Sequence, residues 1–260
     1  MKQDERRPFV QALQRAREAA YEPREYVEQE SFMRAQEIRV LAERAGIQPG
    51  VSVLDVCCGV AGPGRFLTRE LSCDYIGVDS SPSAIDIARA RARGLRCRFE
   101  AAQVPPLPPG TFDVVLLLET MLAFSDKKSL VEAVARALPA GGRFAFTLEE
   151  GLPLTQPERA RMPDADTVWL TQLDEIQTTL ARAGLVVRWQ DDWSRSHLAV
   201  AASLAAAFAA DANAIARQIG RRAFDELLAA HRLWCEWLEA GRIRKIALVA
   251  QQEGSGGGGI

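Results

Sequence analysis

The glycine-rich loop within residues 51–67, VSVLDVCCGVAGPGRFL, constrains the fold more than any other stretch of the chain. It follows a run of aliphatic and β-branched residues, which is typical of a strand buried on both faces of a parallel sheet. A helix is expected to begin near Pro63, where a missing N–H costs nothing. Such a loop lets a ligand approach the main chain and a helix N-terminus. The stretch therefore predicts a nucleotide-like ligand, with an ordinary strand-to-helix turn as the alternative.

A second strand strengthens the ligand hypothesis. Residues 75–79, YIGVD, are mostly apolar and end in Asp79. A carboxylate at the end of the second parallel strand can accept hydrogen bonds from both hydroxyls of a ribose. The two signals together favour a ligand that contains a nucleoside.

The loop resembles the first motif of the class I S-adenosylmethionine-dependent methyltransferases, which runs roughly Asp-x-Gly-x-Gly-x-Gly after the first strand. Asp55 holds the acidic position and Gly59 the central glycine, while Cys57 and Ala61 stand at the outer glycine positions. Because Cys57 and Ala61 carry a Cβ, we expect each to have a negative φ. Gly62 is then expected to supply the permissive backbone.

The resemblance implies further S-adenosylmethionine contacts at the ends of the next strands. Ala102 and Gln103 should lie beside the adenine, with Gln103 replacing the acidic residue that the family often has there. Asp79 should hold the ribose, with Ser80 beside it. Leu118, at the end of the fourth strand, should face the methionine part of the cofactor or the acceptor.

Later landmarks extend the resemblance loosely to residue 249. Residues 139–142, PAGG, stand where the family has Leu-x-Pro-Gly-Gly before strand five, and residues 243–250 indicate a last strand that inserts antiparallel between strands five and six. The resemblance therefore implies an α/β, Rossmann-like methyltransferase fold. Its seven-stranded sheet would be mostly parallel, with a helical insertion before the last strand.

The expected domain organisation follows from these landmarks. Residues 151–163 are expected to form a Pro-rich loop and residues 169–183 a helix. We divide the chain into an N-terminal helical cap or lid (1–46), a cofactor-binding α/β core (47–193), a helical insertion (194–240), the final strand of the core (241–253) and a flexible tail (254–260). The insertion is expected either to cover the acceptor pocket or to form a helical cover or dimer surface.

Candidate catalytic residues follow from the chemistry of methyl transfer. The methyl group of a sulfonium is already activated, so the protein mainly aligns the reactants and excludes water. A base is needed only if the acceptor loses a proton. His197 is the preferred base and Glu119, at the end of strand four, the candidate catalytic carboxylate. His231 lies among leucines and a tryptophan, so it is either a second candidate base or a histidine of the hydrophobic core.

Acceptor contacts are expected from Tyr21, Tyr26 and Glu149. The two tyrosines lie in the N-terminal segment, where their alternative role is to anchor that segment to the core. Glu149 follows strand five and would suit a cationic acceptor, unless it belongs to a solvated loop pair with Glu150. The residues after strand four read ETML rather than Asn/Asp-Pro-Pro-Tyr/Phe, which disfavours methylation of nucleobase or glutamine nitrogens.

Composition narrows the classes of partner. The formal net charge is −2, which argues against a nucleic-acid partner, and no apolar run approaches a membrane span. The five cysteines form no C-x-x-C pair, and neither histidine has the spacing of a zinc ligand, so we expect reduced thiols and no metal. We expect a cytoplasmic monomer or homodimer acting on a small-molecule methyl acceptor.

Two other functions remain open at this point. A nicotinamide-dependent oxidoreductase would share the first strand, loop and helix, although it would not explain residues 139–142. A non-catalytic relative would bind S-adenosylmethionine without turning over an acceptor.

Overall fold

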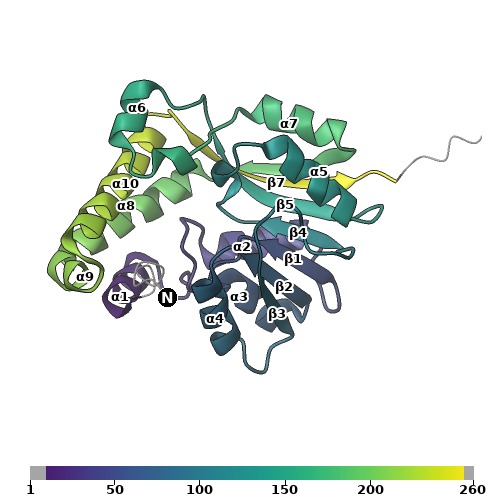
Figure 1. The fold of residues 1–260 in the computed structure, drawn as a ribbon, viewed down its shortest axis with the longest axis horizontal. Coiled ribbons are helices and arrows are strands. Elements are labelled where there is room, and N and C mark those ends of the chain that lie inside the picture. Colours follow the sequence, from purple (N-terminus) through teal and green to yellow (C-terminus); the bar gives the residue numbers. More distant parts are fainter. Residues whose placement is uncertain (1–9, 255–260) are drawn as a thin grey trace, which may run out of the picture.

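A seven-stranded sheet forms the centre of the computed structural model, which describes residues 10–254 (Figure 1). Its strands are β1 Ser52–Val56, β2 Asp74–Asp79, β3 Cys97–Ala101, β4 Val114–Leu117, β5 Arg143–Glu150, β6 Leu185–Asp192 and β7 Arg244–Gln252. They lie in the order β3-β2-β1-β4-β5-β7-β6, and β7 runs antiparallel to both of its neighbours. The predicted methyltransferase fold is thereby confirmed. Apart from Gly254, the predicted tail lies outside the described residues.

Helices cover both faces of the sheet, which explains why its central strands are nearly continuous apolar runs. Successive residues of β1 point to opposite faces, so that Val53 and Leu54 belong to different hydrophobic cores. The Val53 core contains residues of α2 Ala35–Arg44, α3 Gly62–Leu71 and α4 Pro82–Arg91. The Leu54 core contains residues of α5 Lys127–Ala137 and α7 Leu173–Arg182.

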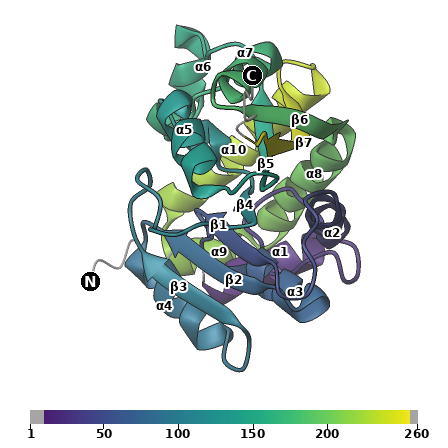
Figure 2. The same cartoon turned by 90° about the vertical axis from the view of Figure 1, so that its right-hand side faces the viewer.

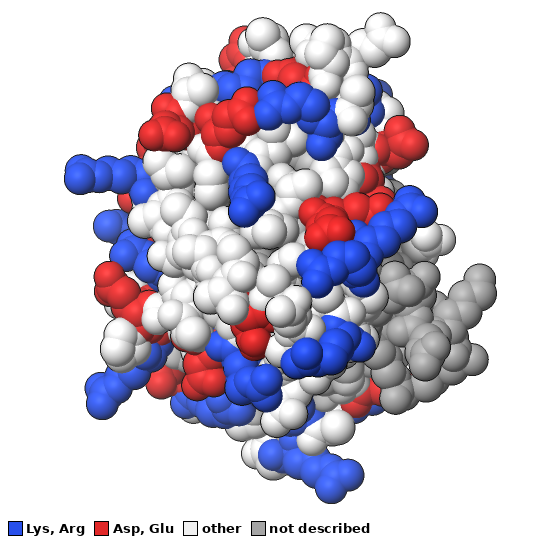
Figure 3. All heavy atoms as spheres, turned by 90° about the vertical axis from the view of Figure 1, so that its left-hand side faces the viewer, with Lys and Arg blue, Asp and Glu red and all other residues white. Residues whose placement is uncertain are grey.

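A third hydrophobic core lies in a helical layer beside the sheet (Figures 1 and 2). It combines α1 Gln11–Ala20 with the insertion, which forms α8 Ser194–Ala210, α9 Ala212–Ile219 and α10 Arg221–Glu239. The N-terminal helix therefore packs on the insertion, although some 170 residues separate them in sequence. Figure 3 views this side, where charges of both signs surround a broad uncharged middle.

No single helix among the described residues is long and apolar enough to cross a membrane, and α8 with α9 meets that criterion only as a pair bent by 82°.

The segment before α7 differs from the expectation. Instead of an unbroken loop, residues 151–163 contain the short helix α6 Gln156–Arg161, which starts with a capping box formed by Thr155 and Glu158. A 3₁₀ turn follows at Ala165–Thr167, and α7 begins at Leu173 rather than at residue 169. The sequence contains this capping pair, but the nearby prolines favoured the prediction of a loop.

Candidate active site

The glycine-rich loop turns sharply between β1 and α3. Cys57 has φ 62° and Ala61 has φ 55°, so the expectation of negative φ at these positions is wrong. A left-handed conformation costs a residue with a Cβ about 1 to 2 kcal/mol and persists where surrounding contacts fix it. The contacts are backbone hydrogen bonds: Cys58 N–H donates to the Val78 carbonyl at 3.0 Å, and Ala61 N–H to the Cys58 carbonyl at 2.8 Å.

Gly62 has a different role from the expected one. It starts α3 without a positive φ, but a Cβ there would overlap the backbone of Val27 and Glu28. Gly62 is therefore required for the close approach of the N-terminal segment, defined here as residues 21–34. The permissive backbone is supplied by Gly59, with φ 54° and open space where a Cβ would lie. A ligand has room to approach the main chain at that point.

The two predicted aspartates have different surroundings. Asp79 is half-buried at the end of β2, and its carboxylate accepts from Gly59 N–H at 2.9 Å and Ser81 N–H at 2.8 Å. Asp55 is buried and accepts from the Tyr75 hydroxyl. Burial raises the pKa of Asp55 to about 7, although the Tyr75 hydrogen bond opposes that shift. Asp55 therefore faces the protein interior, whereas Asp79 remains at the loop.

The other predicted cofactor residues lie at the same carboxyl edge of the sheet. Ser80 follows β2, and Ala102 follows β3 and donates its N–H to the Asp79 carbonyl at 2.9 Å. Gln103 is exposed, and Leu118 follows β4 and is half-buried. With the open space at Gly59, this edge fits a cofactor that contains a nucleoside.

A cavity of about 480 Å³ lies between the N-terminal segment and the helical layer. Its wall is mostly apolar, and such walls with a few polar groups are typical of small-molecule sites. Of the predicted acceptor contacts, Tyr21 lines it, whereas Tyr26 and Glu149 do not; the predicted catalytic residue Glu119 also lines it. Among the remaining residues of the wall are Leu13, Arg17, Glu30, Phe32, Leu122, Met162, Val168, Leu204, Ile219, Leu227, His231, Trp234 and Lys245.

The two predicted tyrosines hold the N-terminal segment. Tyr21 is buried and donates its hydroxyl to the Ser31 carbonyl, while Tyr26 donates to the Gln14 side chain on α1. Their rings pack with centroids 5.4 Å apart. Both residues therefore anchor the segment, and Tyr21 also faces the cavity.

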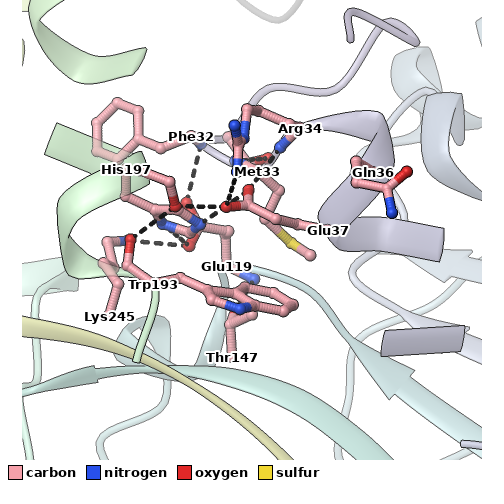
Figure 4. Close-up of polar contacts among 12 residues, drawn as sticks. Phe32, Met33, Arg34, Gln36, Glu37, Glu119, Thr147, Trp193, His197 and Lys245 are labelled. Atoms are coloured by element: carbon pink, nitrogen blue, oxygen red, sulfur yellow. Dashed lines mark hydrogen bonds and ion pairs between the residues drawn. The ribbon is translucent and has the colours of Figure 1, made fainter. Parts of the chain in front are cut away.

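Five ionisable side chains form a buried network that we call the ion cluster: Glu37, Glu119, Glu149, His197 and Lys245. Figure 4 labels all of them except Glu149. Lys245 Nζ lies 3.1 Å from Glu119 Oε1 and 2.8 Å from Glu149 Oε1. The His197 side chain, which is 0% exposed, lies between Glu37 and Glu119, at 3.4 Å from Nε2 and 3.3 Å from Nδ1. These two contacts lack hydrogen-bond alignment, so the attraction is between charges.

Opposite charges determine the protonation states within the cluster. Burial lowers the pKa of His197, but the carboxylates of Glu119 and Glu37 outweigh burial and raise it above its usual value. Burial likewise raises the pKa of Glu119, but Lys245 and His197 outweigh it and hold the pKa well below its usual value. The two carboxylates therefore favour the imidazolium form of His197. His197 is also not among the residues that line the cavity.

The cluster ties four parts of the chain together. Glu119, with φ 55°, accepts from the Phe32 N–H at 2.9 Å and donates its own N–H to the Thr147 hydroxyl at 2.6 Å. Glu37 lies on α2, and Lys245 lies on β7. The cluster thus fixes the N-terminal segment and α8 against the carboxyl edge of β4 and β5.

Comparison with known proteins agrees with this architecture. Residues 53–142 match the family model described as a methyltransferase domain. Phosphoethanolamine N-methyltransferase 3 of Arabidopsis thaliana is 34% identical over 105 residues, 39% of this chain and 21% of that protein. Sterol 24-C-methyltransferase of Eremothecium gossypii is 31% identical over 131 residues, 47% of this chain and 35% of that protein.

Solved structures extend the likeness to the whole fold. The cyclopropane synthase MmaA2 from Mycobacterium tuberculosis superposes with a TM-score of 0.81 at 12% identity, covering 96% of both chains. Residues 53–142 therefore form a methyltransferase domain, and the chain as a whole has the fold of the class I S-adenosylmethionine-dependent methyltransferases. The matches favour a methyltransferase over the nicotinamide-dependent alternative. The chain covers only about a fifth of the plant methyltransferase it matches.

The ion cluster contains two residues that the sequence did not single out, Lys245 and Glu37. Lys245 directly precedes the apolar residues 246–250 of β7 and is buried, and a buried lysine needs a charged partner. Glu37 gave no comparable signal, because α2 also contains Arg39, Glu43 and Arg44 and a further charged residue does not stand out there. Among the described residues, no group of three or more His, Cys, Asp and Glu side chains is placed to hold a metal ion.

Proposed function

We propose that this methyltransferase transfers the methyl group of S-adenosylmethionine to a small organic acceptor bound in the cavity. The observation that carries the proposal is the position of Glu119. It follows β4 at the same sheet edge as Gly59 and Asp79, and it also lines the cavity. An acceptor in the cavity would therefore lie next to the edge that fits the cofactor.

The residues at the sheet edge have distinct proposed roles. Asp79 would bind the ribose hydroxyls, Ala102 and Gln103 would flank the adenine, and Leu118 would contact the methionine part. Gly59 leaves room for the cofactor at the loop. Asp55 would act indirectly, by holding Tyr75 behind the loop. Bound S-adenosylmethionine supplies a methyl group activated by its sulfonium.

The N-terminal segment would keep water away from the acceptor. Its Glu28 pairs with Arg91 at 2.6 Å and also with Arg65, so that the segment is fixed across α3 and α4. Phe32 is held by Glu119 through its N–H. The ion cluster would therefore position the cover of the site rather than take part in the methyl transfer.

The relatives leave the acceptor open, because their names include N-, C- and O-methyltransferases. The cyclase SpnF also shares the fold, with a TM-score of 0.73 at 20% identity and 95% of this chain covered. A shared fold does not define a reaction. The acceptor must therefore be deduced from this chain's own cavity.

Isothermal titration with S-adenosylmethionine tests the cofactor assignment. We expect micromolar binding by the unmodified protein and a loss of about 2 to 5 kcal/mol in binding free energy for Asp79→Ala, since that variant removes a charged hydrogen-bond partner. The matched control is Asp86→Ala on α4, whose carboxylate is exposed in a surface ion pair with Arg89. Equal affinity of the two variants would contradict the assignment of Asp79.

Release of S-adenosylhomocysteine separates a catalyst from a non-catalytic relative. We expect release that depends on an added acceptor. Cofactor binding without release in the presence of any acceptor would favour the non-catalytic alternative.

A further inference from the structure

His231 lies in the wall of the cavity, and only one of its ring nitrogens makes a hydrogen bond within residues 10–254. Its Nδ1 is 2.8 Å from the Leu227 carbonyl, one turn earlier on α10. A carbonyl oxygen can only accept, so Nδ1 carries a proton. In a neutral ring the other nitrogen, Nε2, is then a free acceptor. No hydrogen bond to Nε2 is found within the described part of the chain.

The surroundings of His231 keep its ring neutral. The rings of Phe32 and Phe208 pack against it in T-shaped contacts, with ring centroids 5.7 and 4.9 Å away. Burial lowers the pKa of His231 to about 4, although the Leu227 carbonyl opposes that shift. Tyr21, another polar residue of the wall, is already engaged with the Ser31 carbonyl. Nε2 is therefore available to a bound acceptor at neutral pH.

The charged residues of the described cavity wall are paired with one another. Arg17 lies 2.6 Å from Glu30, and Lys245 lies 3.1 Å from Glu119. A charged acceptor would have to break one of these pairs to find a counterion, and an unpaired buried charge is costly. The rest of the wall is mainly aliphatic and aromatic. The cavity therefore favours a neutral acceptor with an apolar body.

We propose that Nε2 of His231 accepts the proton of a hydroxyl group on a neutral, largely apolar acceptor, so that the protein makes a methyl ether. This inference rests on the proposed methyltransferase function. As the acceptor oxygen bonds to the methyl carbon, the bond from that carbon to sulfur breaks and its electron pair stays on sulfur. The hydroxyl proton passes to Nε2. The products are the ether, S-adenosylhomocysteine and an imidazolium that returns its proton to water.

Nitrogen-15 NMR of the histidine rings tests the premise without catalysis. The chain has two histidines, so a protein without added histidines gives two sets of ring signals, which His231→Gln assigns. At pH 7 we expect His231 to be neutral with its proton on Nδ1, and His197 to be protonated on both nitrogens. A His231 ring that is protonated at pH 7, or that carries its proton on Nε2, would overturn the proposal.

Matched acceptors test the chemistry. Each pair has one apolar skeleton with a hydroxyl or an amine, such as 1-naphthol with 1-naphthylamine and geraniol with geranylamine. We expect S-adenosylhomocysteine release to favour the hydroxyl member, and His231→Gln to lower kcat with it about 10²-fold or more. Cofactor affinity should stay unchanged. Arg232→Gln, an exposed neighbour on α10, should behave as the unmodified protein does.

The outcomes separate the inference from the function on which it rests. A preference for the amine member of every pair, or full activity of a folded His231→Gln variant with the hydroxyl member, overturns the role of His231 alone. Failure of the unmodified protein to bind S-adenosylmethionine overturns the proposed function, and the inference falls with it.

Discussion

His197 and His231 lie on neighbouring helices of the insertion, yet their surroundings differ in one decisive respect. His197 has a carboxylate within 3.4 Å of each ring nitrogen. His231 has a carbonyl at one nitrogen and two aromatic rings in T-shaped contact with its own ring. Burial lowers the pKa of both rings, but only His197 has the counterions that reverse the shift. The comparison teaches that neighbouring charge, rather than depth, decides the protonation state of a buried histidine.

Phe32 connects the two regions. Its N–H donates to Glu119 of the ion cluster, and its ring packs on His231. Lys245 Nζ also lies 5.2 Å from the centre of the Phe32 ring. The ion cluster therefore fixes Phe32, which in turn packs on the neutral ring of His231. This arrangement suits a positioning role for the ion cluster and a catalytic role for His231.

The largest expected effect comes from breaking the ion cluster. Lys245→Met leaves Glu119 and Glu149 without their buried cation, and removing one partner of a buried pair costs about 3 to 5 kcal/mol. Urea unfolding should show that loss in the free energy of unfolding. Arg244→Met is the matched control, since the adjacent Arg244 forms partly exposed ion pairs, and exposed pairs contribute at most about 1 kcal/mol.

An equal, small loss in both variants would break the comparison, because it would show that the cluster is solvated. A variant that does not fold at pH 7 would agree with the large loss, and lowering the pH should then partly restore it by protonating the carboxylates.

The pH dependence of stability should separate the two histidines. The raised pKa of His197 gives stability that is fully present below the unfolded value of about 6.5 and lost as pH rises toward the folded value. The lowered pKa of His231, about 4, gives a contribution that increases as pH rises from 4 to about 6.5. Each slope is at most about 1.4 kcal/mol per pH unit.

Urea unfolding from pH 4.5 to 8.5 measures both slopes. His197→Gln should remove the decline above pH 6.5, and His231→Gln should remove the rise below it, relative to the unmodified protein. The two variants serve as controls for each other. If they have the same pH profile, the two rings do not differ in charge and the comparison fails.

The sequence predicted the sheet well because its signals are local. The apolar run before Asp55, the break at residues 139–142 and the last apolar strand each lie within a few residues, and all three were confirmed. The φ angles at Cys57 and Ala61 were mispredicted, since the contacts that hold them come from β2 and from the loop itself. A residue's intrinsic preference does not reveal such support.

The candidate site was less accessible from the sequence, because it forms between distant segments. Glu37 and His197 meet only when α2 and α8 are placed on the sheet. His197 and His231 looked alike as sequence, one near a helix start and one among leucines. Which of them has a carboxylate beside it is a property of packing. The sequence therefore pointed to both histidines and favoured His197 as the base, without any signal of the carboxylates that surround it.

The smallest expected effect concerns the aromatic ring that packs on His231. Phe208 is 0% exposed, and Phe208→Leu opens space beside the ring, so that water lowers the desolvation penalty of the imidazolium. NMR titration should show the pKa of His231 rising by roughly half a unit, with no change at His197. Phe146→Leu is the control, because Phe146 is equally buried but belongs to the core around β5. Both variants should lose about 1 to 2 kcal/mol of stability, so a pKa change seen in both would reflect loosened packing. A change confined to Phe208→Leu would show that the dry aromatic wall itself keeps His231 neutral.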